Sequence, residues 1–323
     1  MKSGLIKIDV SGMSRAEWLA ERRKGLGGSD AASVLGLNEY NSPYALWCEK
    51  TGKIVPNESE DSEAIRLGND LEQYVAERFM EATGEKVRRS NFMFKNDEFP
   101  FAHANPDRLV IGEDAGLECK TTSSWETAKM LRNGEIPKRW YCQCCHYMMV
   151  TGCRKWYLAA LAFGAGFFYF ALEREEAEIQ ALAEAEREFW ARVCNGTPPS
   201  IDGSDATTEA IQSLYYESDS LNRLDLSAVG SHIEAYNAIE KKIKELEEMQ
   251  TEHENAIKVY MGDCEKGEYG DNSVTWKSIK RRTFDRESFE RENGKIPEKF
   301  FKDKQSRSFR VVTKRRGGFI CHL

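Results

Sequence analysis

The sequence predicts a mixed α/β domain, with a central mixed sheet flanked by helices, followed by an extension of a different character. Three observations support this fold class. Helical patterns come first, three strand-like stretches follow, and two more strands return after further helices. The stretch NGTPPSIDG, from Asn195 to Gly203, has the composition of a linker. We therefore expect a core domain over residues 1–200 and a C-terminal extension over residues 205–323.

The first helices are predicted from their capping residues. Ser14 and Glu17 have the spacing of a capping box, and the helix that they open should run to about Lys24. A glycine-rich turn follows it. Ser29 is then the expected N-cap of a second, short helix.

Two further helices complete the N-terminal part. Ser42 should cap the first of them, with Pro43 at its first position and Gly52 closing it. The second should span about residues 61–82, because apolar residues four apart form one stripe along it. The members of this stripe are Leu67, Leu71, Val75 and Phe79.

The predicted sheet and its covering helices occupy the rest of the core. The expected strands are Val87 to Lys95, Ala102 to Ile111, Ala115 to Thr122, Lys155 to Ala162 and Gly166 to Glu173. The expected helices are about Ser124 to Asn133, Lys138 to Val150, and a charged helix that runs to about Cys194.

The extension is predicted to be a long helix followed by basic strands. The helix covers residues 227–262, where isoleucines recur among charges with an imperfect heptad. The strands fall within residues 269–316. Residues 275–316 hold 15 Lys and Arg against 6 Asp and Glu, a local charge of +9 within a chain of net charge −7. This segregation favours a surface that meets phosphates, although a solvated basic hairpin without a partner has the same composition.

Composition indicates a globular protein of the cytoplasm. The 323 residues are 41% hydrophobic and 31% charged, which is typical of water-soluble domains. The longest apolar run is broken by two glycines, and the N-terminus lacks the apolar core of a signal peptide. The nine cysteines are therefore expected to be reduced, and the cluster of Cys142, Cys144, Cys145 and Cys153 to be buried thiols rather than a metal centre.

The stretch GLECKTTSS, from Gly116 to Ser124, carries the candidate chemistry. In a strand, Glu118 and Lys120 share one face while Leu117 and Cys119 share the other. A half-exposed strand with an ion pair would look the same. Asp107 decides between these interpretations, because it lies eleven residues before Glu118 and a short turn can bring the two together.

Two facing carboxylates repel each other unless a cation lies between them. Mg²⁺ suits such a pair, because it prefers one or two carboxylates together with water and phosphate oxygens. A bound Mg²⁺ activates water and polarises a phosphoryl oxygen. Lys120 would position or deprotonate the attacking water and offset charge in the transition state. The pattern therefore predicts phosphodiester hydrolysis.

Pro106, Asp107, Glu118 and Lys120, read as P-D and E-x-K, resemble the motif of the PD-(D/E)XK nucleases, whose core is that of the restriction endonucleases. Three flanking stretches resemble one branch of them, the YqaJ-like viral recombinase nucleases, which include the phage lambda exonuclease. These stretches are GLGGSDAASVLGLNEYNSPYALWCEKTG, GNDLEQYVAERF and YCQCCHYMMVTG. The motifs keep the order of the family over roughly residues 14–173, about half of the chain.

The resemblance implies a set of metal ligands and a catalytic lysine. Asp107 and Glu118 would bind the metal, with the backbone carbonyl of Cys119 completing the shell. Lys120 would be the catalytic lysine. Glu72 would contact the metal directly or through water.

Alternatives remain for Glu72 as the helix residue that contacts the metal. A lone Glu on an amphipathic helix is more often solvated surface, and Glu77 and Asp70 are rivals to Glu72 in the same stretch. Gln143 would be the catalytic-site glutamine of the family, with Tyr147 one turn later on the same helical face. Together they would touch a phosphate or order the nucleophilic water, or they would simply pack.

The resemblance also implies a phosphate-binding group. Arg22 and Ser29 match the family positions that contact the terminal or scissile phosphate, and helix N-terminal N–H groups favour anions. Arg23 is a near-equal candidate for Arg22. His103, close to the Pro-Asp pair, is expected to be a structural or substrate-side group.

The function implied by the resemblance is a Mg²⁺-dependent exonuclease, with Mn²⁺ as a substitute, that acts on double-stranded DNA ends. It would degrade 5′ to 3′ and leave 3′ single-stranded tails for a phage annealing protein. The gene would be phage or prophage encoded and the protein would act in the bacterial cytoplasm, away from membranes. A homo-oligomer is expected, but residues after about 205 have no counterpart in the lambda-type trimer. The alternatives are a restriction or repair endonuclease, and a non-catalytic DNA-binding module.

Overall fold

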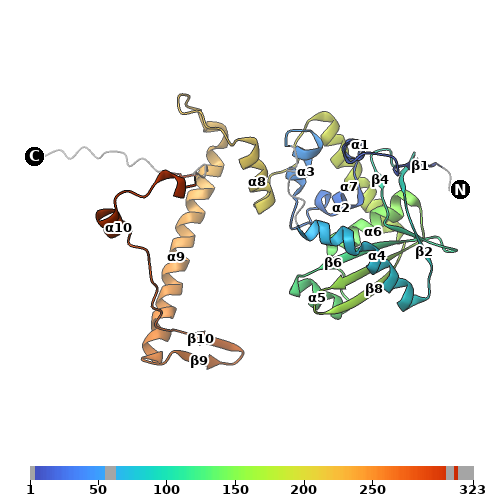
Figure 1. Cartoon of the computed structure of the whole chain (residues 1–323). Coiled ribbons are helices and arrows are strands. Elements are labelled where there is room, and N and C mark those ends of the chain that lie inside the picture. Colours follow the sequence, from blue (N-terminus) through green and yellow to red (C-terminus); the bar gives the residue numbers. More distant parts are fainter. Residues whose placement is uncertain (1–3, 55–62, 303–308, 312–323) are drawn as a thin grey trace, which may run out of the picture. The chain divides into compact units, whose positions relative to one another are not determined.

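The computed structural model describes residues 4–54, 63–302 and 309–311. It divides into two compact units, Met1–Tyr215 and Tyr216–Leu323 (Figure 1). The first unit extends past residue 200, where the sequence suggested a boundary. In the described part of the chain, no helix is both long enough and apolar enough to cross a membrane.

A five-stranded mixed sheet forms the centre of the first unit, as the sequence predicts. The strand order is β2-β5-β6-β7-β8, in which β6 and β7 are parallel and the other neighbours antiparallel. The strands are β2 (Val87–Arg89), β5 (Arg108–Val110), β6 (Ala115–Thr122), β7 (Lys155–Ala162) and β8 (Gly166–Glu173). The bounds of the last three agree with the sequence prediction.

A second, three-stranded antiparallel sheet was not predicted. It has the order β1-β3-β4. Its strands are β1 (Leu5–Asp9), β3 (Phe92–Asn96) and β4 (His103–Ala104). The predicted strands 87–95 and 102–111 were therefore wrong as single elements, because each divides between the two sheets. The second one breaks at Pro106, which has no N–H to donate to a ladder.

The helices of the first unit follow the predicted order, except that the last of them was not predicted. They are α1 (Arg15–Arg22), α2 (Gly28–Val34), α3 (Pro43–Lys50), α4 (Glu63–Thr83), α5 (Trp125–Arg132), α6 (Lys138–Thr151), α7 (Glu176–Asn195) and α8 (Asp205–Leu214). The capping box of Ser14 and Glu17 is present, and Ser42 accepts a hydrogen bond from the backbone N–H of Ala45. Asp61, the expected start of α4, lies outside the described residues.

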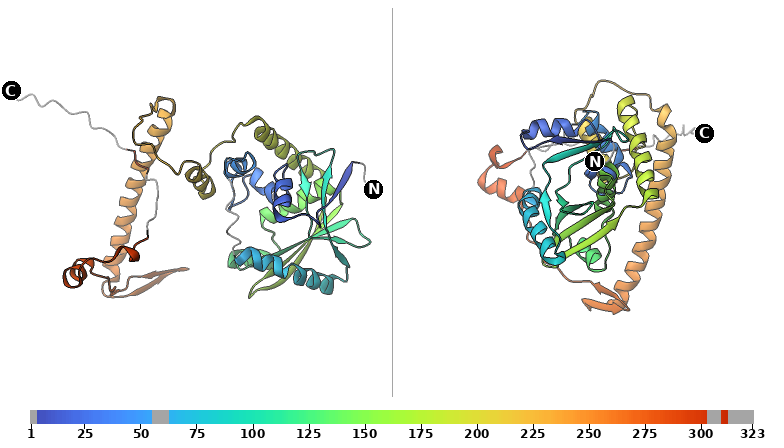
Figure 2. Two further views of the ribbon diagram at one scale, coloured as in Figure 1. Left: turned by 45° about the horizontal axis from the view of Figure 1, so that its top comes forward. Right: turned by 90° about the vertical axis from the view of Figure 1, so that its right-hand side faces the viewer.

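Helices α4 and α6 cover opposite faces of the large sheet (Figure 2). On the α4 face, Val75 and Phe79 pack against Leu117. Leu67, at the other end of the predicted stripe, is 40% exposed, so only the later part of the stripe faces the core. Because side chains alternate along β6, Glu118 and Lys120 face α6.

The second unit departs from the prediction of basic strands over 269–316. Its elements are η1 (Ser227–Val229), α9 (Gly230–Met261), β9 (Lys266–Tyr269), β10 (Asn272–Thr275), α10 (Arg286–Asn293) and η2 (Glu298–Phe300). The long helix is confirmed. The β9–β10 hairpin ends at Thr275, and the chain then becomes helical because Asp285 caps α10 by accepting from the backbone N–H of Ser288. Residues 303–308 and 312–316 lie outside the described part.

Candidate active site

The β5–β6 hairpin brings Asp107 beside Glu118. The two strands pair antiparallel with Arg108 opposite Leu117, so the preceding residue Asp107 lies opposite Glu118. The Oδ2 atom of Asp107 accepts a hydrogen bond of 2.8 Å from the backbone N–H of Cys119. This bond fixes the Asp107 carboxylate at the edge of β6, where the sequence placed it.

Glu118, Lys120 and Gln143 form a closed polar triangle. Lys120 Nζ lies 2.6 Å from Glu118 Oε1 and donates to Gln143 Oε1 at 2.9 Å. The Gln143 side-chain amide donates in turn to the same Glu118 oxygen at 2.7 Å. Gln143 is on α6, so this triangle joins the strand to the helix that covers it. The amide is well suited to the place, because its oxygen accepts from an ammonium while its nitrogen donates to a carboxylate.

The electrostatics of the site are unbalanced toward negative charge. Glu118 is 3% exposed, and its second oxygen, Oε2, is buried without a hydrogen-bond partner among the described residues. Burial, together with the charges of Glu118 and Glu72, raises the pKa of Asp107 well above its ordinary value. Burial disfavours the charge of Lys120, but Glu118 and Asp107 outweigh that effect and raise the pKa of the lysine. Crowded carboxylates with an unused oxygen are what a bound cation would relieve.

The donor set fits a hard divalent cation, although no ready-made centre is present. Among residues 4–54, 63–302 and 309–311, no three His, Cys, Asp or Glu side chains are grouped closely enough to hold a metal by themselves. Asp107 and Glu118 supply two carboxylates, which is the usual protein contribution to a Mg²⁺ site. Burial and the nearby carboxylates raise the pKa of the Cys119 thiol well above its ordinary value, so its backbone carbonyl is the suitable donor.

Glu72 approaches from the other face of the sheet. Its carboxylate forms an ion pair with Arg108, whose side chain is only 3% exposed. Arg108 also donates to the Asp107 carbonyl at 2.9 Å and to the Gln73 side chain at 3.1 Å. Sequence reasoning missed Arg108, because a charged residue beside a candidate ligand gives no sign of the face toward which it points. The rival Glu77 is exposed and accepts from Gln73 on its own helix.

Gln143 and Tyr147 lie on one face of α6, as their spacing predicts. The Gln143 amide donates to the Tyr147 hydroxyl at 2.9 Å, and this hydroxyl donates to the Asn105 carbonyl at 3.2 Å. Tyr147 is thus buried against the segment that leads into Asp107. Helix α2 begins directly over the pair: a Cβ atom on Gly28 would lie 2.5 Å from the Tyr147 ring. Only glycine lets α2 approach α6 this closely.

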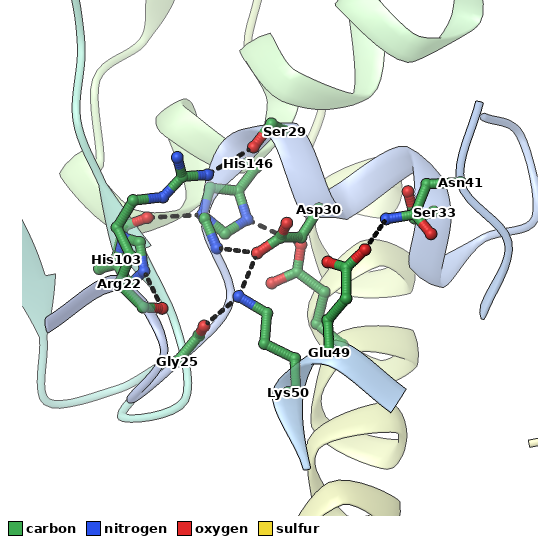
Figure 3. A network of polar contacts seen from close by, with 12 residues as sticks. Arg22, Gly25, Ser29, Asp30, Ser33, Asn41, Glu49, Lys50, His103 and His146 are labelled. Carbon is green, nitrogen blue, oxygen red and sulfur yellow. Dashed lines mark hydrogen bonds and ion pairs between the residues drawn. The ribbon is translucent and has the colours of Figure 1, made fainter. Parts of the chain in front are cut away.

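Arg22 and Ser29 lie together and form a second polar group in addition to the triangle of Glu118, Lys120 and Gln143. Arg22 Nη2 donates to Ser29 Oγ at 2.9 Å (Figure 3). The Arg22 guanidinium lies 4.8 Å from the centre of the Trp18 ring. The prediction that Ser29 caps α2 was wrong. Gly27 is the N-cap, because the side chain of Asp30 reaches back to accept from the Gly27 N–H. Ser29 therefore lies inside the first turn, with its hydroxyl turned to Arg22.

The mixed sheet has helices on both faces, Glu118 and Lys120 lie on β6, and Asp107 directly precedes the adjacent strand β5, so the residues of the P-D and E-x-K motifs meet at one place. The chain belongs to the YqaJ-like viral recombinase family. The model of the YqaJ-like viral recombinase domain matches residues 17–154. The uncharacterized protein YqaJ of Bacillus subtilis (strain 168) is 39% identical over 305 residues, which are 93% of this chain and 95% of that protein.

Two solved structures are more distantly similar. The alkaline exonuclease LHK-Exo of Laribacter hongkongensis is 22% identical, with a TM-score of 0.49 over 56% of this chain and 94% of that one. A phage related exonuclease of Haemophilus somnus 129PT is 12% identical, with a TM-score of 0.43 over 53% of this chain and 96% of that one.

Proposed function

We propose that this protein is a divalent-metal-dependent exonuclease that degrades double-stranded DNA from its ends. The observation that carries the proposal is the constellation of Asp107, Glu118, Lys120 and Gln143, in which Glu118 Oε2 is buried and unused. Membership of a viral recombinase family supports DNA as the substrate. By resemblance to the lambda exonuclease, the direction is 5′ to 3′ and the product a 3′ single-stranded tail.

Asp107, Glu118 and the Cys119 carbonyl would hold Mg²⁺ or Mn²⁺, with Glu72 reaching it directly or through water. When bound, such a cation lowers the pKa of a water molecule and polarises a phosphoryl oxygen. Glu72 is restrained by Arg108, so it acts from a fixed position on α4.

Lys120 and Gln143 act on the water and the phosphate. The ammonium of Lys120 is already oriented by Glu118 and Gln143, so it needs no reorganisation to donate to the scissile phosphate or to the attacking water. Its positive charge offsets the charge that develops on the phosphorus oxygens. Tyr147 supports this arrangement by holding the Gln143 amide and the Asn105 carbonyl.

Arg22 and Ser29 would bind the phosphate at the DNA end. The guanidinium and the hydroxyl already share a hydrogen bond, so both present donors to one location. The product strand implies a single-strand annealing protein as partner. The implied setting is phage-type recombination in the cytoplasm of a bacterial host.

End-labelled linear duplexes test the proposal. With Mg²⁺ present, a duplex with 5′ phosphates should be shortened from its 5′ ends, and chelation of the metal should stop the reaction. A duplex with 5′ hydroxyls should be degraded more slowly if Arg22 and Ser29 bind the terminal phosphate. Covalently closed circles should remain intact. Cleavage of closed circles would instead identify an endonuclease, and no cleavage of any duplex would overturn the proposal.

A further inference from the structure

Glu186, His146 and His103 form a buried chain of polar contacts that ends at the Arg22 carbonyl. Figure 3 shows His146, His103 and Arg22. Glu186 and His146 are 0% exposed and His103 is 1% exposed. Their positions are on α7, α6 and β4, and Arg22 ends α1. Four elements that are distant in the sequence are therefore tied together at their side chains or carbonyls.

The direction of each contact follows from the atoms involved. His146 Nε2 lies 2.9 Å from the His103 carbonyl, which can only accept, so this nitrogen carries a proton. The other nitrogen, Nδ1, lies 2.7 Å from Glu186 Oε1. Both nitrogens of the His146 ring are thus used, one toward α7 and one toward the strand.

His103 connects His146 to Arg22 through its own ring. The Asn105 side-chain amide lies 3.3 Å from His103 Nδ1, and its N–H must donate there, which leaves the proton on Nε2. Nε2 donates to the backbone carbonyl of Arg22 at 3.1 Å. The ring also fills the turn before α2, since a Cβ atom on Gly27 would lie 2.9 Å from His103 Cε1.

Packing alone does not explain why the Glu186 carboxylate and the His146 imidazole are buried here. Burying a carboxylate and an imidazole removes both from water, and a pair of apolar side chains of similar volume often serves stability as well or better. Within the part of the chain that the structure describes, the Glu186 Oε2 atom has no hydrogen-bond partner. What apolar residues could not do is hold the His103 carbonyl, and through it the ring that fixes the end of α1.

We propose that Glu186 and His146 are positioning residues for the phosphate contact of Arg22. The inference rests on the proposed function, because it takes the Arg22–Ser29 pair as the group that binds the DNA end. Glu186 lies outside residues 17–154, to which the family model extends. Loss of the contact chain should shift the end of α1, and so separate the guanidinium from the place where the terminal phosphate binds.

Two substitutions of His146 separate positioning from packing. The amide of Gln reaches about as far as Nε2 of histidine, so His146→Gln should keep the hydrogen bond to the His103 carbonyl. The shorter amide of Asn overlaps Nδ1, so His146→Asn should keep Glu186 and lose His103. Glu186→Gln, whose amide can donate to Nδ1, and Glu186→Leu, which cannot, form a second pair.

The measurement is steady-state cleavage of duplexes with 5′ phosphate and 5′ hydroxyl ends. For His146→Asn and Glu186→Leu, KM for the phosphorylated end should rise about tenfold with kcat nearly unchanged, the effect of about one hydrogen bond. Glu186→Gln should stay close to the parent protein. His146→Gln, which keeps the His103 contact but not the Glu186 contact, should lie between the parent and His146→Asn. Leu182→Ala, a buried substitution on the same helix, controls for lost stability and should keep the preference for phosphate.

A readout independent of cleavage follows the position of Arg22 directly. The ¹⁹F signal of fluorotryptophan at Trp18 should report the stacked guanidinium, and it should shift more in His146→Asn than in His146→Gln. A parent protein that cleaves no duplex would sink the proposed function, and the Arg22 contact alone would fall if the parent cleaves but ignores the terminal phosphate. A parent that prefers it, with unchanged preference and an unchanged Trp18 signal in His146→Asn, would overturn the positioning role alone.

Discussion

Glu118 and Lys120 are the residues on which the chemistry depends most directly. Glu118→Ala or Lys120→Ala should abolish cleavage while leaving the protein folded, because each removes a charge that faces the site rather than the apolar core. Glu113→Ala is a matched control, since Glu113 also pairs with a strand lysine, Lys155, outside the site. Circular dichroism checks the fold, and turnover with Mg²⁺ checks the role. Normal turnover in either site variant would refute the assignment.

Arg108 is expected to be important for stability through Glu72. Arg108→Met leaves the half-buried Glu72 carboxylate without its partner, and we expect a loss of about 2 kcal/mol in the free energy of unfolding. Adding Glu72→Met should recover most of that loss, since no charge is then stranded. Urea unfolding of the single and double variants measures both. Equal stabilities of Arg108→Met and the parent would show that the ion pair contributes nothing.

His103 should make stability depend on pH. Burial lowers the pKa of its ring to about 3, whereas the ring of the unfolded chain titrates near 6.5. Below about pH 6.5 the unfolded chain binds a proton that the folded chain does not, so the contribution is complete above that pH and declines toward pH 3. The cost should reach about 1.4 kcal/mol near pH 5.5. His103→Gln should flatten this part of the unfolding profile, and an unaltered slope would contradict the argument.

At the scale of elements, the contact of α2 with α6 is the tightest constraint on the site. Gly28→Ala would place a methyl group against the Tyr147 ring, and we expect a loss of about 1–3 kcal/mol from the forced shift. Gly230→Ala is the natural control, because Gly230 also begins a helix and no atom of the described residues lies within 4 Å of its added Cβ. Thermal unfolding should separate the two variants, and similar melting temperatures would refute the packing argument.

Local patterns allowed the site strand and its hairpin to be predicted, because alternation and turn length are properties of neighbouring residues. The residues that the prediction missed depend on partners that are distant in the sequence. Strand β1 pairs with β3 across more than eighty residues, and Arg108 has its role only because α4 packs over it. The contact of His146 with Glu186 joins two helices, and the sequence pattern of neither helix indicates this contact.

At the scale of the whole molecule, the basic part of the extension has a measurable electrostatic consequence. Removing the residues after Gly267 should weaken duplex binding and reduce its dependence on salt, because fewer counterions are released when fewer phosphates are contacted. Fluorescence anisotropy across a salt series, with a catalytically silent Lys120→Ala background in both proteins, measures the slope. Equal slopes would exclude the extension from binding DNA.

Helix α8 gives one practical guide for handling this protein. Thr207 is 1% exposed, and its Oγ1 atom lies 2.7 Å from the Ser42 hydroxyl that caps α3. Proteolysis or gene truncation within the Pro-rich stretch near residue 200 would remove α8 and expose Ser42 and Ala45, which lie against it. A soluble fragment intended for crystallisation should therefore retain every residue up to Tyr215.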